Sequence, residues 1–378
     1  MRIIVTGNDE SAAREFRELL LRGKHSVEVF LIAPDEIVDR LIHVRADAVF
    51  LLESSDPERA LALTKEILDV LPLRIVIVGP EVEAKAVLRL LGEGVYHYLT
   101  QHEAEADLIE LLQRLKQQAP VAVNMGRIIS VLGAGGGAGA TMLAVNVAMQ
   151  LTLHHPRTAL LDLRLQDGAA ANLLDLQPAN TLVDFCRNIN RMDETLFERC
   201  LTRHDKGLRV LAAPRSPRDI AQVSGRGIRR AINMARRAFD YVLIDLDGVS
   251  RPHEVYGLLQ TDVMLVVLRL DFTSVRKARF LLDALDDLEI DQKKVQLIVN
   301  QFHRRGELPV RDVEKLLGRR ITQFIPDDAR RVNAAINGGI PFVLQQPRAP
   351  VSKVIQSIAV SVNGHMPQKH AMISGTRG

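Results

Sequence analysis

The fold of this chain is decided by ISVLGAGGGAGAT, residues 129–141. An apolar segment leads into a glycine-rich turn, and Thr141 then opens a run of small and apolar residues that predicts a helix. Backbone N–H groups of such a turn wrap around an anion, and the helix adds the positive end of its dipole. The usual phosphate-binding pattern ends in Gly-Lys-Ser/Thr, but Ala140 stands at the lysine position. The stretch therefore predicts a phosphate cradle that lacks much of the catalytic charge.

Three polar residues follow later strands in the order that a nucleotide site requires. Asp162 lies near the end of the expected strand Thr158–Leu163. Asp245 lies in the strongly apolar strand Tyr241–Leu246, where a carboxylate can hold Mg²⁺ and its water. Asn300 follows the next but one strand, where its amide can face a base. A tight strand-to-helix turn needs no ligand by itself, so the prediction of nucleotide binding depends on this order.

The composition limits the classes of function. A length of 378 residues predicts two or three domains, and the absence of Trp with 4% aromatic residues argues against nucleic-acid recognition by stacking. A formal charge of +3 is too small to indicate a polyanionic partner. Cys186 and Cys200 form no metal-binding or redox spacing and are expected to be reduced thiols. No signal pattern and no membrane-spanning run is visible, so we expect a cytoplasmic chain with at most peripheral membrane contact.

Strands and helices alternate along most of the chain. The first expected strands are Arg2–Thr6, Val27–Ile32, Ala48–Leu52, Arg74–Val78 and Val95–Leu99, with helices at Ser11–Leu21, Pro57–Val70, Glu83–Leu91 and Ala104–Lys116. The later strands are Arg127–Leu132, Thr158–Leu163, Leu208–Ala212, Tyr241–Leu246, Val263–Leu268, Val295–Val299 and Ile321–Phe324. This alternation predicts an α/β chain with two parallel sheets, each covered by helices. We expect domains at residues 1–118 and 127–363, a linker at 119–126 and a disordered tail at 364–378.

From about Arg127 to Asn363 the chain resembles the ParA/MinD family of deviant Walker-A P-loop ATPases. The family's loop reads Lys-Gly-Gly-x-Gly-Lys-Thr, and Gly135 and Ala140 stand at its two lysine positions. In the family, the first lysine reaches the partner's phosphates across a dimer and the second neutralises the β- and γ-phosphates. The next family strand ends in Asp-x-Asp, whose second Asp is associated with hydrolysis, and Arg164 replaces that Asp. The resemblance therefore implies a nucleotide site without its principal charges.

The cofactors implied by this resemblance are ATP or ADP with Mg²⁺. The residues implied to bind the nucleotide are Gly135, Gly136, Gly137, Ala138, Gly139, Ala140, Thr141, Met142, Asn300, Pro326 and Asp327. Thr141 and Asp245 are the candidates for holding Mg²⁺, in part through water, and Asp162 and Asp245 are the candidates for positioning the ion or a water. Loss of one preorganised donor typically costs about 2.7–4 kcal/mol of transition-state stabilisation, and such losses do not add. We therefore expect nucleotide binding with very slow or no hydrolysis.

The first domain resembles a response-regulator receiver, which has a CheY-like (flavodoxin-like) fold. Asp9 and Glu10 follow the first strand as the receiver's acidic pair does, but Glu53 stands where a receiver carries its phosphorylated Asp. Gly79 replaces the switch hydroxyl, and Gln101 follows the strand after which a receiver carries Lys. The resemblance implies a pseudo-receiver whose three remaining acids form a pocket without phosphotransfer. The plain alternative is an α/β domain with solvated acids at its strand ends.

Two further segments have alternative interpretations. One expected helix carries five arginines, Arg226, Arg229, Arg230, Arg236 and Arg237. A solvated helix face is the commoner explanation of such a pattern, and contact with anionic lipid or DNA is the alternative. The segment Pro350–Val362 predicts a terminal amphipathic helix. Core packing is favoured over membrane insertion for it because Lys353 is its one basic residue.

A pseudo-receiver followed by a ParA/MinD-like domain without its lysines resembles the TadZ/CpaE family over nearly the whole chain. That family belongs to the tight-adherence (Flp, type IVc) pilus machinery, marks a site such as a cell pole, and helps recruit the secretion apparatus. The resemblance implies a homodimer near the inner membrane at a pole, with the pilus motor ATPase or a polar landmark protein as partner. Because Gly135 has no side chain to cross a dimer, we expect dimerisation that depends little on ATP.

Two other classes of protein stay open at this point. An active ParA/MinD-type ATPase that positions DNA or other cargo would require hydrolysis and salt-sensitive DNA binding, and we do not expect DNA as the partner. A stand-alone signalling regulator would need an output motif such as a helix-turn-helix, which the sequence does not display.

Overall fold

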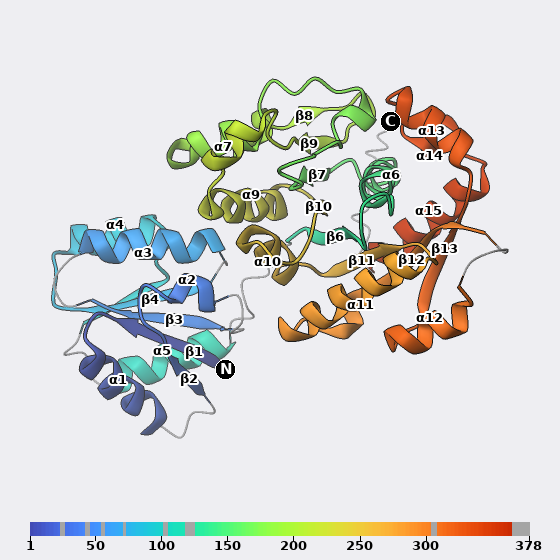
Figure 1. The fold of residues 1–378 in the computed structure, drawn as a ribbon. Coiled ribbons are helices and arrows are strands. Elements are labelled where there is room, and N and C mark those ends of the chain that lie inside the picture. The colour runs from blue at the N-terminus through green and yellow to red at the C-terminus, as the bar shows by residue number, and fades with distance from the viewer. Residues whose placement is uncertain are drawn as a thin grey trace, which may run out of the picture.

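The computed structural model of this chain describes residues 1–22, 27–41, 46–53, 57–70, 73–100, 105–117, 125–303 and 308–364. Two sheets, one of five strands and one of eight, form the centres of two lobes (Figure 1). The expected linker up to residue 124 and the tail beyond residue 364 lie outside the described residues. No helix of the described part is long and apolar enough to pass through a bilayer.

The first sheet is entirely parallel and has the strand order β2-β1-β3-β4-β5. Its strands are β1 (Arg2–Gly7), β2 (Glu28–Leu31), β3 (Ala48–Leu52), β4 (Arg74–Gly79) and β5 (His97–Thr100). Its helices are α1 (Glu10–Arg22), α2 (Ile37–Arg40), α3 (Pro57–Val70), α4 (Ala84–Gly92) and α5 (Glu105–Gln117). The same order occurs in flavodoxin-like doubly wound sheets.

Alternation along the strands buries both faces of this sheet. Ile3 and Val5 of β1 belong to the core beneath α1 and α5, while Ile4 belongs to the core beneath α2, α3 and α4. Both cores need apolar residues, so the central strands are nearly continuous apolar runs, as parallel sheets covered on both faces require.

The second sheet has the order β13-β12-β11-β6-β10-β7-β9-β8, in which the short β8 is antiparallel to β9 and the other neighbours are parallel. Its strands are β6 (Arg127–Gly133), β7 (Thr158–Asp162), β8 (Thr202–Arg203), β9 (Arg209–Leu211), β10 (Tyr241–Leu246), β11 (Val263–Leu268), β12 (Val295–Phe302) and β13 (Ile321–Pro326). Its α-helices are α6 (Ala140–Thr152), α7 (Leu182–Arg187), α8 (Glu194–Cys200), α9 (Gly225–Ala238), α10 (Pro252–Leu259), α11 (Phe272–Asp287), α12 (Val310–Leu317), α13 (Ala329–Asn337), α14 (Phe342–Gln345) and α15 (Pro350–Asn363).

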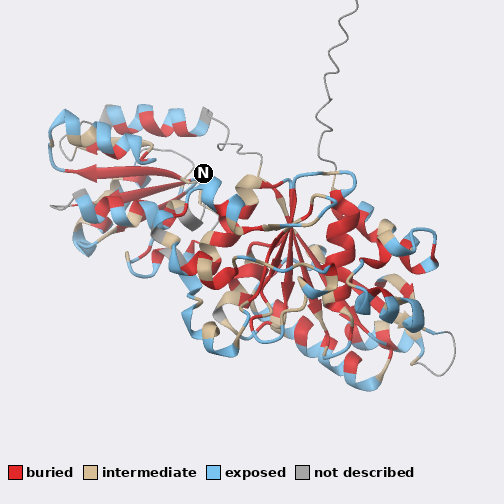
Figure 2. Ribbon diagram, turned by 90° about the horizontal axis from the view of Figure 1, so that it is seen from above, coloured by how far each residue is buried: buried red, intermediate tan, exposed pale blue. Residues whose placement is uncertain are grey.

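The strands of the second sheet lie in the middle of the core (Figure 2). Helix α6 is buried almost throughout and packs against α15, which contributes Ile355, Ile358 and Val362 to the same core. The prediction that the terminal segment packs in the core is therefore confirmed. Burial of α6 fixes the direction of its first turn, where the glycine-rich loop ends.

The expected strands all form, with boundaries that differ by a few residues. The expected strand Val95–Leu99 is observed at β5, two residues later, because Val95 is still in the turn after α4. Strand β12 continues to Phe302 past an irregularity at Gln301, whose φ is 54°. The sequence pattern did not reveal β8 and α2, since two to four residues are too few to show a period.

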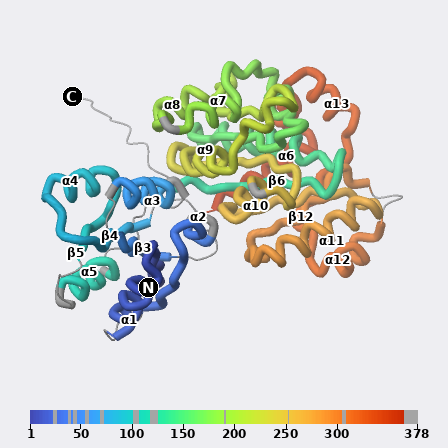
Figure 3. The backbone as a smooth tube through the Cα atoms, turned by 60° about the vertical axis from the view of Figure 1, so that its left-hand side comes forward, coloured from blue at the N-terminus to red at the C-terminus, as the bar shows by residue number. Residues whose placement is uncertain are grey.

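The two lobes contact each other through α3 and α9 (Figure 3). Arg237 of α9 donates a hydrogen bond of 2.7 Å from its guanidinium to the backbone carbonyl of Leu68 in α3. Buried apolar residues continue from the α3 side of the first sheet to the α9 side of the second. Helix α9 leads directly into β10, so this contact lies one element away from Asp245.

Candidate nucleotide site

The turn between β6 and α6 is a nest of backbone N–H groups. Gly135, Gly137 and Gly139 have φ angles of 112°, 76° and 89°, in the left-handed region that favours glycine. Within the described part of the chain, seven N–H groups of this turn find no acceptor: those of Gly135, Gly136, Gly137, Gly139, Ala140, Thr141 and Met142. Exposed N–H groups at the start of a helix require a ligand or water, and an anion satisfies several of them at once.

Asn300 holds this turn in place from β12, which is separated from β6 by β11. Its side-chain amide, 4% exposed, donates a hydrogen bond of 2.8 Å to the carbonyl of Ala138. A Cβ on Gly139 would lie 2.2 Å from the same amide nitrogen, so the turn and Asn300 fit only because residue 139 is glycine. The predicted contact between Asn300 and a base stays a prediction, and the structure adds a role in fixing the turn.

Asp162 and Asp245 are register partners at the ends of β7 and β10, and both are almost completely buried. Burial, reinforced by the negative charge of Asp162, raises the pKa of Asp245 to about 8. Burial also raises the pKa of Asp162 to about 6, although N–H groups donated by Ala170 and Arg164 oppose this rise. Two adjacent buried carboxylates cannot both be ionised unless a cation lies nearby.

The two carboxylates differ in their partners. Asp162 accepts hydrogen bonds from the N–H groups of Arg164 (3.2 Å) and Ala170 (3.0 Å), and so holds the loop after β7. Neither oxygen of Asp245 has a partner within the described part of the chain. Thr141 approaches Asp245 closely enough to lower its pKa, although no hydrogen bond of ordinary geometry joins the two. A buried carboxylate without partners beside a hydroxyl fits Mg²⁺, which binds through one or two such oxygens and water.

Arg164 is held by two other carboxylates. Its guanidinium lies 2.6 Å from Asp167 and 3.2 Å from Asp247, and its side chain is 17% exposed. These contacts join the loop after β7 to the loop after β10. Arg164 therefore neutralises local acids, and it leaves position 164 without a carboxylate that could position a water.

The other predicted nucleotide residues lie at the edges of the turn. The side chains of Ala140 and Met142 are buried, so these two residues can contact a ligand only through their backbone N–H groups. Pro326 ends β13, and Asp327 follows it with its carboxylate 3.0 Å from His303. Asp327 therefore lies at the same end of the sheet as Asn300, on the neighbouring strand.

Two residues of α11 also contact the turn, and the sequence reading missed them. The hydroxyl of Ser274 donates to the carbonyl of Ala134 at 3.2 Å. Lys277 lies across Gly135, with its Cδ and Nζ 2.9 and 3.2 Å from the place that a Cβ on Gly135 would take. No motif marks these residues because their contact depends on how the β11–α11 connection passes the turn. Their spacing of three on one helix face is the one signal in the sequence.

The three predicted pocket acids of the first domain have different environments. Asp9 accepts from the N–H groups of Ser11 and Ala12 at the start of α1, Glu10 pairs with Arg14, and Glu53 is buried. Within the described residues, no group of three or more His, Cys, Asp or Glu side chains is arranged to hold a metal. A Mg²⁺ ion at Asp245 would accordingly need further ligands from the Thr141 hydroxyl, a phosphate and water.

The arginines of α9 correct an expectation. Four of the five bind protein groups: Arg229 lies over the ring of Tyr256, Arg230 donates to the Met192 carbonyl, Arg236 binds Asp262 and the Gln260 carbonyl, and Arg237 binds the Leu68 carbonyl. The interpretation of this helix as a freely solvated face is therefore wrong for these four half-buried residues, and contact with lipid or DNA stays a prediction. The arginines face the body of the protein because α9 is packed between the two lobes.

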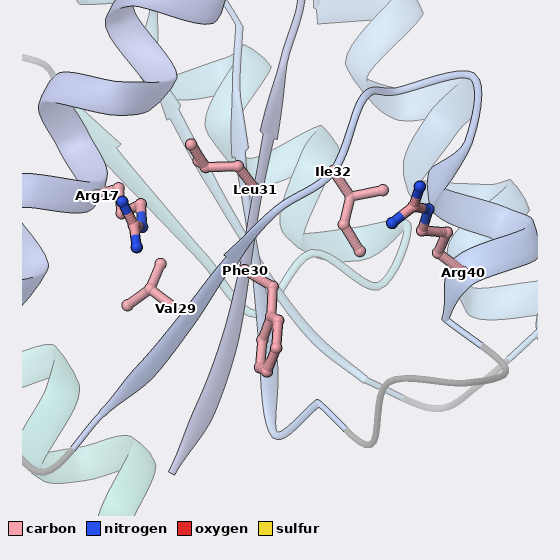
Figure 4. A pocket seen from close by; sticks show the side chains of 6 residues that line it. All are labelled: Arg17, Val29, Phe30, Leu31, Ile32 and Arg40. Carbon is pink, nitrogen blue, oxygen red and sulfur yellow. The ribbon is translucent and has the colours of Figure 1, made fainter. Parts of the chain in front are cut away.

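A hollow of about 310 Å³ lies at the free edge of the first sheet, far from the turn (Figure 4). Its lining is Arg17, Val29, Phe30, Leu31, Ile32 and Arg40. Among the described residues, this lining of apolar strand side chains with an arginine at each end contributes no nucleophile and no acid.

The fold of the second sheet and its turn is that of ParA/MinD-type P-loop ATPases. A ParA family ATPase from Chlorobium tepidum TLS superposes with a TM-score of 0.59 at 23% identity, over 63% of this chain and 98% of that protein. MinD of Pyrococcus horikoshii OT3, solved with Mg-ADP, superposes with a TM-score of 0.54 at 18% identity, over 64% of this chain and 97% of that one.

The sequence comparison points the same way. The putative septum site-determining protein MinD of Guillardia theta is 25% identical over 266 residues, which are 67% of this chain and 94% of that protein. No protein-family model matches the chain. The proteins that the chain resembles in both comparisons are thus MinD and ParA proteins, and the likeness shows the fold of the second sheet.

Proposed function

We propose that this chain binds ATP or ADP with Mg²⁺ in the turn between β6 and α6 and hydrolyses ATP very slowly or not at all. The observation that carries the proposal is the combination of seven unpartnered N–H groups with the buried, unpartnered carboxylate of Asp245. The N–H groups attract the phosphates, and the carboxylate with Thr141 offers Mg²⁺ a place. MinD of Pyrococcus horikoshii was solved with Mg-ADP, which supports the same cofactor here.

The residues of the site would divide the work as follows. The N–H groups from Gly135 to Met142 hold the phosphates, Thr141 and Asp245 orient Mg²⁺, and Asn300 keeps the turn in shape. When bound, the ion supplies charge that offsets the phosphate oxygens. Arg164 stands where a carboxylate would be needed to hold an attacking water, and it is committed to Asp167 and Asp247. The arrangement favours retention of the nucleotide over its cleavage.

We further propose that the chain is a localisation and assembly factor of a tight-adherence (Flp, type IVc) pilus system. It would act as a cytoplasmic homodimer at a cell pole and recruit the pilus motor ATPase or a polar landmark protein. The support is the order of the two parts, a flavodoxin-like sheet without receiver chemistry followed by a ParA/MinD-type sheet without its lysines. Residues 1–118 would serve as the docking domain.

Calorimetry with Mg-ADP and Mg-ATP, beside a phosphate-release assay, tests the nucleotide proposal. We expect binding of both nucleotides, weaker binding after Thr141→Ala, and turnover far below one per second. A matched control is Thr322→Ala, because Thr322 bears a hydroxyl that binds the Leu297 carbonyl away from the turn. Absence of binding by the wild-type chain would reject the proposal.

The second candidate is an active ParA/MinD-type ATPase that positions DNA or other cargo. The fold and the curated MinD relatives favour it. It predicts brisk turnover, near one per second, and DNA affinity that falls steeply with salt. A DNA titration over a range of salt concentrations distinguishes the two candidates.

A further inference from the structure

Helix α11 contacts the glycine-rich turn through Ser274 and Lys277. Ser274 bonds to the Ala134 carbonyl, and its oxygen also accepts the N–H of Arg269, which fixes the hydroxyl at the start of the helix. Lys277 follows three residues later, on the same helix face. The side chain of Lys277 is thereby directed to the turn by a hydrogen bond one helical turn before it.

Lys277 takes the space that a side chain at position 135 would need. A Cβ on Gly135 would lie 2.9 Å from Cδ and 3.2 Å from Nζ of Lys277, and Gly135 has a φ of 112° that disfavours any side chain. Glycine at position 135 and the lysine on α11 therefore fit each other. Within the described part of the chain, no carboxylate lies within ion-pairing distance of Lys277.

We propose that Lys277 is the cation of this phosphate site and binds the terminal phosphates of a di- or triphosphate nucleotide. The inference rests on the proposed nucleotide binding by the same turn. Lys277, on α11 outside the loop, supplies the positive charge that Gly135 and Ala140 cannot. A charge-assisted hydrogen bond of this kind corresponds to about 10- to 100-fold in affinity.

Two other basic residues at this end of the sheet, Arg164 and Arg269, are paired with carboxylates. Arg164 is bound by Asp167 and Asp247, and Arg269 pairs with Asp271 at 2.9 Å. Arg276 precedes Lys277 on α11 and is exposed, and it is not among the side chains that lie against Gly135. This difference makes Arg276 a matched control of equal charge on the same helix.

The test measures dissociation constants of Mg-ADP, AMP and inorganic tripolyphosphate by calorimetry. The proteins are the full-length wild type, Lys277→Ala, Lys277→Arg and Arg276→Ala. We expect Lys277→Ala to weaken ADP and tripolyphosphate by about 10- to 100-fold and to change AMP much less, because AMP lacks the terminal phosphate. Lys277→Arg should recover most of the affinity, and Arg276→Ala should match the wild type. Circular dichroism confirms that each variant is folded.

The outcomes separate this inference from the proposed function. Equal ADP affinity in the wild type and Lys277→Ala overturns the role of Lys277 while nucleotide binding stands. Binding of tripolyphosphate that depends on Lys277, without binding of Mg-ADP, supports Lys277 as a phosphate-binding residue and rejects the nucleotide proposal. No binding of any probe by the wild type overturns both. If Arg276→Ala loses as much affinity for ADP and tripolyphosphate as Lys277→Ala, the effect is a general one of positive charge on α11, and the inference is also overturned.

Discussion

Replacing Asp245 by Asn tests the chemistry of the buried carboxylate pair in the absence of any ligand. Asp245 is fully buried, its oxygens have no partner within the described residues, and its pKa is raised from 3.8 to about 8 by burial and by Asp162. In the range between these two pKa values the native protein keeps a proton that the unfolded chain releases. The free energy of unfolding therefore falls as the pH rises from about 4 to about 8, and the fall is complete above the folded pKa.

The expected magnitude follows from the size of this shift. Each pH unit between the unfolded and folded pKa values corresponds to about 1.4 kcal/mol, so retaining the proton at pH 7 costs about 4 kcal/mol and at about pH 4.5 costs about 1 kcal/mol. Asn removes this cost but buries amide N–H donors without partners, which costs about 1–3 kcal/mol. Asp245→Asn should thus stabilise the ligand-free protein at pH 7 and lose that advantage by about pH 4.5. The difference in the free energy of unfolding between Asp245→Asn and the wild type should therefore change by about 3 kcal/mol between about pH 4.5 and pH 7.

Urea denaturation followed by far-UV circular dichroism measures this difference, since the chain has no Trp for fluorescence. Magnesium and nucleotide are omitted and the pH is varied in steps. Asp287→Asn serves as the control, because Asp287 is exposed at the end of α11. If the free energies of unfolding of the wild type and Asp245→Asn show the same dependence on pH, Asp245 does not keep its proton in the folded protein, and the reasoning is refuted.

Three further substitutions have specific expected results. Gly139→Ala places a Cβ 2.2 Å from the Asn300 amide at a φ of 89°, so we expect a loss of more than about 1 kcal/mol in urea denaturation, and an unchanged midpoint would contradict the close approach. Arg164→Leu removes two ion pairs of partly exposed carboxylates, and we expect a loss of about 1 kcal/mol that 1 M salt reduces, measured in the same way; insensitivity to salt would argue against it. Arg237→Ala should speed amide hydrogen exchange at the end of α3 near Leu68, measured by mass spectrometry, and unaltered exchange there would show that the two lobes do not depend on this bond.

Much of the fold could be predicted from the sequence because its signals are local. The apolar strand Tyr241–Leu246 and the turn that ends at Thr141 appear where the pattern placed them. Backbone conformation at Gly135 and Gly139 is also a local property, since only glycine takes those φ angles without strain. The left-handed glycine turn could therefore be predicted from the sequence without knowledge of the packing around it.

The partners of the site residues could not be predicted, because they depend on packing between distant segments. Asn300 binds the Ala138 carbonyl across 162 residues of sequence, and Ser274 reaches Ala134 across 140. The ion pairs of Arg164 with Asp167 and Asp247 and the position of Lys277 against Gly135 likewise depend on how separate loops and helices come together. The arginines of α9 illustrate the same limit, since a charge pattern does not reveal whether a helix faces solvent or another domain.

The bond between Arg237 and Leu68 has a consequence for how the first domain can be studied. Leu68 lies in the last turn of α3, where backbone carbonyls have no partner inside their own helix. The second domain thus supplies a C-terminal cap to a helix of the first. If the first domain were separated from the second, this end of α3 would lose its cap and fray, so an isolated fragment would not reproduce the surface of the first domain in the intact chain.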